Sequence, residues 1–184
     1  MAPQLVTAQP DDVLAFWREA GPSRWFRKDA EFDAECRNRL LGAHEAAMRG
    51  DLDVWGRHAD GALALLLLLD QFPRNAFRGT ARMYESDAKA RAVARAAIEA
   101  GFDKGVEPDL RNFFYLPLMH SEDLADQDRA VELARGLGGE ALRYALMHRG
   151  IIEKFGRFPH RNEVLGRTGT PEEQKFLADG GFAG

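Results

Sequence analysis

Apolar and polar positions repeat with the period of an α-helix over most of the chain. An apolar stripe from Phe32 to Ala47 follows the 3.6-residue repeat, in a helix that begins near Asp29 and ends at Gly50. From about residue 59 to 72 the chain is apolar on every side, which is typical of a helix at the centre of a bundle. Alternating runs bounded by hairpin turns are nearly absent, so the pattern favours helices throughout.

This pattern predicts an all-α protein made of short helices joined by brief loops, arranged as an irregular array of antiparallel helix pairs. The chain has no linker, charge block or low-complexity tract long enough to separate domains, and we therefore predict one domain over residues 1–184. No 34-residue period is visible, so the pattern does not predict a regular solenoid of tetratricopeptide repeats.

Two similar segments, residues 72–75 and 158–162, each follow an apolar helix, begin with Phe-Pro and end with Arg-Asn. Proline stops a helix from continuing and asparagine fixes a turn, so each arginine should project from a constrained loop. Such an arginine suits bidentate recognition of a carboxylate or phosphate. The alternative is that each loop caps a helix and its arginine bonds the exposed carbonyls. The candidate ligand-binding residues are Arg74, Asn75, Arg157, His160, Arg161 and Asn162.

Asp70 lies at the C-terminal end of the apolar helix, where the helix dipole disfavours a negative charge. A buried carboxylate there must be paired or protonated, and Arg74, Arg157 or Arg161 is the expected partner. Asp70 is therefore interpreted either as part of a structural salt bridge or as a pre-oriented acid in a pocket. His120, Glu122, His148 and Asp70 are the candidate catalytic residues, although each also has a structural interpretation as a helix-terminal or core residue.

Composition excludes several classes of function. The net charge of −4 argues against a nucleic-acid binder, and the longest apolar run is too short to cross a membrane. The single cysteine, Cys36, suits a reducing cytoplasm and excludes an intramolecular disulfide. Phosphate-loop, dinucleotide and metal-ligand spacings are missing, so we predict no cofactor and no metal.

Three blocks of the chain carry a family resemblance: residues 69–75 (LDQFPRN), 117–122 (PLMHSE) and 155–162 (FGRFPHRN). They resemble the signature blocks of an uncharacterised bacterial family, which is catalogued as a domain of unknown function and classed as tetratricopeptide-like. The resemblance implies an α-α superhelix of helix pairs. It implies no activity, and no catalytic residue is transferred from it.

Three interpretations of the polar residues remain open at this point. The chain could be a scaffold that binds a protein partner, as helix-pair arrays commonly do. It could bind a small anionic molecule, or carry out acid–base chemistry on one, where the two Phe-Pro segments and His120 converge. The polar residues could also form a buried network that only fixes the packing of the helices.

Overall fold

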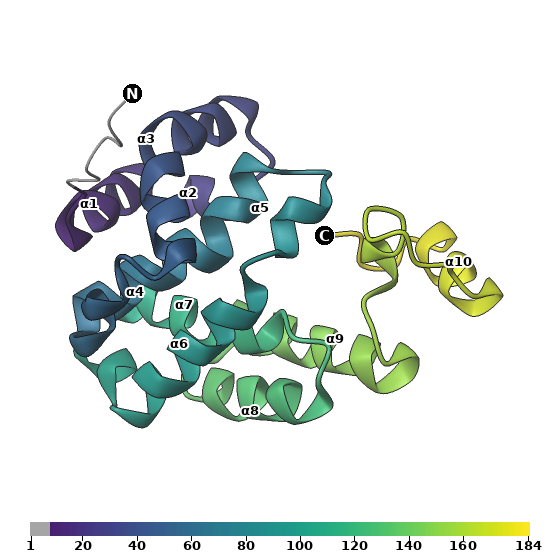
Figure 1. Cartoon of the computed structure of the whole chain (residues 1–184). Coiled ribbons are helices and arrows are strands. Elements are labelled where there is room, and N and C mark those ends of the chain that lie inside the picture. The colour runs from purple at the N-terminus through teal and green to yellow at the C-terminus, as the bar shows by residue number, and fades with distance from the viewer. Residues whose placement is uncertain (1–7) are drawn as a thin grey trace. The chain divides into compact units, whose positions relative to one another are not determined.

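The computed structural model describes residues 8–184, and over these residues it contains helices and turns but no β-strand. The prediction of an all-α fold is therefore confirmed. The α-helices in Figure 1 are α1 (Pro10–Ala20), α2 (Pro22–Trp25), α3 (Ala30–Arg49), α4 (Ala59–Leu66), α5 (Phe72–Ala76), α6 (Asp87–Glu99), α7 (Pro108–Met119), α8 (Leu124–Arg135), α9 (Gly139–Phe155) and α10 (Pro171–Ala178). The shorter turns are η1 (Asp53–Arg57), η2 (Leu67–Gln71), η3 (Ala81–Tyr84), η4 (Phe102–Gly105) and η5 (Pro159–Arg161).

The helices group into two compact units. Unit 1 comprises Met1–Arg78 and Arg82–Pro117, and unit 2 comprises Gly79–Ala81 and Leu118–Gly184. Helices α1 to α6 and nearly all of α7 belong to unit 1, whereas α8, α9 and α10 belong to unit 2. The expectation of a single domain over residues 1–184 stays a prediction.

Helix α3 begins and ends where the sequence pattern placed its limits. The Asp29 carboxylate accepts hydrogen bonds from the backbone N–H groups of Glu31 (3.1 Å) and Phe32 (3.0 Å). Gly50 adopts a left-handed φ of 92°, which glycine tolerates without strain, and this conformation ends the helix. The apolar stripe from Phe32 to Ala47 is buried at each predicted position, so this prediction is confirmed.

The centre of unit 1 is the apolar segment formed by α4 and η2. Every residue from Ala62 to Leu69 is at most 1% exposed, which confirms the prediction of a helix covered on all sides. This burial removes a large apolar area from water and is the main stabilising contribution in the unit. Among residues 8–184, no helix is long and apolar enough to cross a membrane.

The prediction that Pro73 ends this helix is wrong, because the chain passes through one π-helical turn, η2, and continues as α5. Pro73 has no N–H to offer the carbonyls of Leu68 and Leu69, which lie five and four residues before it. Two side chains replace the missing donor: His44 Nδ1 donates to the Leu68 carbonyl (2.9 Å), and the Ser86 hydroxyl donates to the Leu69 carbonyl. Helix propagation past the proline is therefore possible because long-range hydrogen bonds satisfy the carbonyls it leaves open.

Unit 2 is built on α8 and α9, which are joined by a short turn and pack side by side (Figure 1). Gly156 ends α9 in a left-handed conformation with φ of 69°. The second Phe-Pro segment then forms the 3-10 turn η5, and Thr170 caps the start of α10, since its hydroxyl accepts from the Glu173 N–H (3.2 Å). A small apolar cluster of Ile151, Ile152 and Phe158 joins these elements.

Candidate functional site

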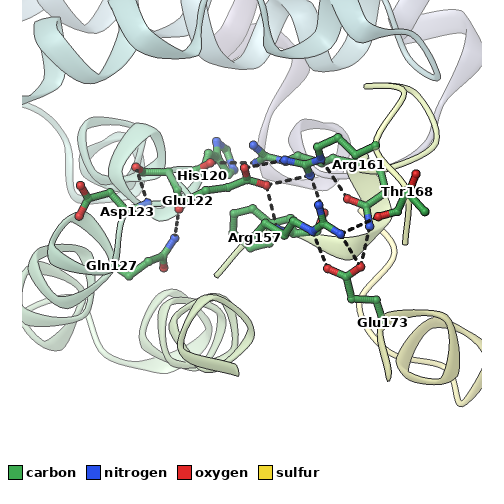
Figure 2. Close-up of polar contacts among 12 residues, drawn as sticks. His120, Glu122, Asp123, Gln127, Arg157, Arg161, Thr168 and Glu173 are labelled. Carbon is green, nitrogen blue, oxygen red and sulfur yellow. Dashed lines mark hydrogen bonds and ion pairs between the residues drawn. The ribbon is translucent and has the colours of Figure 1, made fainter. Parts of the chain in front are cut away.

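The segment between α7 and α8 is held in place by the first turn of α8, as Figure 2 shows. Asp123 caps the helix, and Gln127 Nε2 donates to the carbonyls of Met119 (2.7 Å) and Ser121 (2.6 Å). Of these bonds, the one to Met119 satisfies a carbonyl that the end of α7 leaves without an intrahelical donor. They fix the backbone from which the candidate residue Glu122 projects.

Glu122 joins this segment to the second Phe-Pro segment. Its carboxylate accepts hydrogen bonds from the Phe158 N–H (2.8 Å) and from two nitrogens of Arg167 (2.8 and 3.1 Å). Burial opposes ionisation of the carboxyl group, but the hydrogen bonds from Arg167 and the Phe158 N–H outweigh it and lower the pKa of Glu122. Glu122 is therefore an ionised acceptor that links segments 36 residues apart.

Arg157 forms a second bidentate pair in unit 2 (Figure 2). Its Nε and Nη2 donate to the Glu173 carboxylate at 2.6 and 2.8 Å, and Nη2 also donates to the Thr168 carbonyl (2.8 Å). The same carboxylate accepts from Asn162 Nδ2 (3.0 Å) and the Thr170 N–H (2.8 Å). The hydrogen bonds from Arg157, together with that from Thr170, lower the pKa of Glu173 to about 2 against the opposing effect of burial. This pair fastens α10 to the Phe-Pro segment.

Three candidate histidines from separate parts of the sequence lie near one another in unit 2, two of them against Phe158. The Phe158 ring lies 5.5 Å from the ring of His148 and 5.6 Å from that of His160, and His120 lies 6.2 Å from His148. Phe182 packs against His148 (4.7 Å) and His160 (5.1 Å) from the C-terminal segment. These contacts bring imidazoles from three segments of unit 2 together, and imidazole is the side chain most often used as a general acid or base.

Arg161 completes the surroundings of Phe158. Its Nη2 donates to the His120 carbonyl (2.9 Å), and its guanidinium carbon lies 4.5 Å from the centre of the Phe158 ring. The side chain thus combines a hydrogen bond with a cation–π contact, and the residue is 7% exposed. Within the described part of the chain, no group of three His, Cys, Asp or Glu side chains is arranged to hold a metal ion.

In unit 1 the carboxylate of Asp70 lies against Arg74, one of the three partners considered from the sequence. Arg74 Nη1 is 3.3 Å from Asp70 Oδ1, and the guanidinium also forms a bidentate pair with Asp87 (2.9 and 3.0 Å). Gln71 Nε2 donates to the other oxygen of Asp70 (2.7 Å). The two carboxylates raise the pKa of Arg74 despite its burial, so the guanidinium stays charged. Asp70 is held by charge and hydrogen bonds at the end of the buried helix.

Two arginines outside the candidate set, Arg78 and Arg167, form ion pairs of the same kind. Arg78 donates to both oxygens of Asp33 (2.8 and 2.9 Å), and Asn75 Nδ2 donates to the same carboxylate (2.9 Å). Arg167 makes the equivalent bidentate pair in unit 2 and is bonded to the amide of Asn162 (3.0 Å). The two arginines occupy corresponding places in the sequence, because each Phe-Pro segment is followed by a second arginine a few residues after its Arg-Asn pair.

The structure places the predicted site residues in two separate groups. Asp70, Arg74 and Asn75 lie in unit 1, and the other group, in unit 2, is His120, Glu122, His148, Arg157, His160, Arg161 and Asn162. Within their own units, the candidate arginines all bond to carboxylate or carbonyl oxygens. These contacts favour a role in packing, and ligand binding by these residues stays a prediction.

A different feature of unit 2 is a surface hollow of about 410 Å³ between α8 and α9. Leu146 is 50% exposed in it. The acidic side chains beside it are engaged by neighbours: Asp128 accepts from Arg149 (2.6 Å) and Glu132 pairs with Arg129. The residues that line the hollow are Asp128, Val131, Glu132, Arg135, Leu146 and Arg149.

Comparison with known proteins identifies the family. A family model described as a bacterial protein of unknown function, DUF924, matches residues 13–181. The chain belongs to the DUF924 family. A solved structure titled as a protein of unknown function, ATU0120 from Agrobacterium tumefaciens, is 54% identical, covers 93% of this chain and 97% of its own, and superposes with a TM-score of 0.91. No curated protein matches the chain. Membership in DUF924 confirms the resemblance to an uncharacterised bacterial family.

Proposed function

We propose that this DUF924 protein is a cytoplasmic interaction scaffold of the tetratricopeptide-like, α-α superhelical kind, and that the α8–α9 face receives a protein partner. The observation that carries the proposal is Leu146, a large apolar residue left half exposed in a hollow rimmed by charged side chains. An apolar centre with a polar rim is the usual composition of a protein interface. Helix-pair arrays commonly bind partners on such faces.

The ion pairs that the candidate arginines already form support a protein-binding face over a small-molecule site. Arg157 and Arg74 each form a bidentate pair with a carboxylate of their own unit. An anionic ligand would have to displace Glu173 or Asp87 from these pairs, which costs the hydrogen bonds already made. The hollow on α8–α9 requires no such displacement.

A crosslinking experiment in cells tests the proposal. Leu146 is replaced by a photo-crosslinking amino acid, and Val54 (56% exposed in unit 1) is replaced in a matched control. We expect irradiation to yield a defined crosslinked band, identified by mass spectrometry, from position 146 and not from position 54. Purified components should reproduce the complex. Equal crosslinking from both positions, or none from position 146, would contradict the proposal.

A second candidate function, acid–base chemistry on a small anion, is favoured by one observation: His148, His160 and the Arg161 guanidinium contact Phe158, and His120 lies beside His148. Imidazolium and guanidinium groups both attract carboxylates and phosphates. Thermal shift with inorganic phosphate and simple carboxylates is the test. This function requires a stabilisation that His148→Gln abolishes, since binding to the folded state alone raises the melting temperature.

A further inference from the structure

The charged residues of α8 at the hollow form a polarised stripe. Asp128, Glu132 and Arg135 are spaced at i, i+4 and i+7, so they lie along one face of the helix, with Val131 beside them. Along α8 the two acids precede the arginine, so the negative charges lie on the N-terminal side of the positive charge. Among the described residues no ion pair holds Arg135, whereas Asp128 and Glu132 are both paired.

The two ends of this stripe are complementary to a second copy in the antiparallel orientation, whereas Glu132 of each copy lies next to the axis, where its pair with Arg129 of the same chain offsets its charge. If two α8 helices cross about a twofold axis between residues 131 and 132, Asp128 of each copy faces Arg135 of the other. The two positions are seven residues apart, or roughly 10 Å along the helix, and both contacts form together. Twofold symmetry imposes this reciprocity, because the same patch is used on both copies.

The charge balance of the face also favours a second copy. The chain as a whole carries a net charge of −4, so two copies repel one another over most of their surfaces. The lining of the hollow holds two acids and two arginines and is neutral. Leu146 of α9, beside the stripe, supplies apolar area that would be covered at the centre of the contact.

We propose that the α8–α9 face is an isologous dimer interface, in which Asp128 and Arg135 pair across the twofold axis over Leu146. This inference rests on the proposed function and names its partner as a second copy of the chain. Helix α8 has 12 residues and is roughly 18 Å long, so a two-helix face offers about 400 Å² per copy. Stable dimers bury about 800 Å² per copy, and we therefore expect a weak dimer with Kd on the order of 10–100 μM.

Sedimentation equilibrium over a concentration range that spans this Kd measures the dimer. We expect Leu146→Glu to weaken association at least tenfold, because it places a carboxylate at the apolar centre. Val54→Glu, a matched change at an equally exposed residue of unit 1, should leave the monomer–dimer equilibrium unchanged. A wild-type chain that stays monomeric at every concentration overturns the inference.

Charge reversal tests the antiparallel register. Asp128→Arg gives a face with two outer arginines, and Arg135→Asp gives one with two outer acids, so each variant alone should lose the dimer. An equimolar mixture of the two should associate at least as tightly as the wild-type chain, since opposite faces then meet. The double variant should regain self-association. Both sites are exposed, and circular dichroism should be used to check that each variant is folded.

The outcomes separate this inference from the proposed function. If position 146 crosslinks to a different protein and the purified chain is monomeric, the scaffold proposal stands and the dimer is overturned. If the chain dimerises but the mixture of reversed variants does not associate, the antiparallel register is wrong. If position 146 captures nothing and no dimer forms, both fail.

Discussion

Glu173→Gln tests whether the buried pair with Arg157 fastens α10 to the rest of unit 2. The Glu173 side chain is 3% exposed, and its carboxyl pKa is lowered from 4.5 to about 2, chiefly by the hydrogen bonds from Arg157. This lowering of the Glu173 pKa corresponds to about 3 kcal/mol of stability at neutral pH. Because the folded-state pKa is the lower one, this contribution is complete above about pH 5 and is lost as pH falls toward 2.

The assay has to report on unit 2. Trp17, Trp25 and Trp55 all lie in unit 1, so tryptophan fluorescence serves as an internal control. Native-state hydrogen exchange of residues 157–178 at pH 7 gives the opening free energy of the segment. We expect Glu173→Gln to lower it by about 3 kcal/mol. Glu172→Gln, which removes the same charge from an exposed neighbouring residue, should change it by less than about 0.5 kcal/mol.

The pH dependence supplies the sharper criterion. At pH 3 the wild-type chain has already lost more than half of the contribution of Glu173, so the difference in unfolding free energy between wild type and Glu173→Gln, from urea unfolding followed by circular dichroism, should shrink to less than half of its value at pH 7. A difference as large at pH 3 as at pH 7 would show that the variant acts through packing, and the electrostatic account of α10 would be refuted.

Other predictions concern unit 1. Gly61→Ala should destabilise the unit by about 2–3 kcal/mol in urea unfolding followed by tryptophan fluorescence, because the added methyl group overlaps the Trp55 carbonyl. Ser86→Ala should cost about 1–3 kcal/mol by the same measurement, since it leaves the buried Leu69 carbonyl without its donor; no effect would mean that another donor replaces it. Cys36 is buried and its thiol pKa is raised to about 12 by that burial, so a thiol reagent should label it only at the rate of unfolding; fast labelling of folded protein would contradict this.

The positions of the helices were largely predictable because the forces that set them are local. The apolar stripe and caps of α3 lie within a few residues of one another, and so do Thr170 and Glu173 at the start of α10. The same local argument failed at Pro73. A proline normally ends a helix, but here the open carbonyls are bonded by His44, 24 residues away from Leu68, and by Ser86.

By itself, the sequence determined the all-α class, the buried central helix and the segments that carry the polar residues. Only the tertiary structure decided which carboxylate each arginine binds. Arg167 pairs with Glu122, which is 45 residues away along the chain, and Arg78 pairs with Asp33 at the same sequence separation. An ion pair forms only when its two groups lie within a few ångströms of one another. The number of residues between two groups along the chain does not determine that distance in the folded protein. For the same reason the half-exposed Leu146 and the hollow beside it were visible only after folding, since exposure depends on which neighbours cover a side chain.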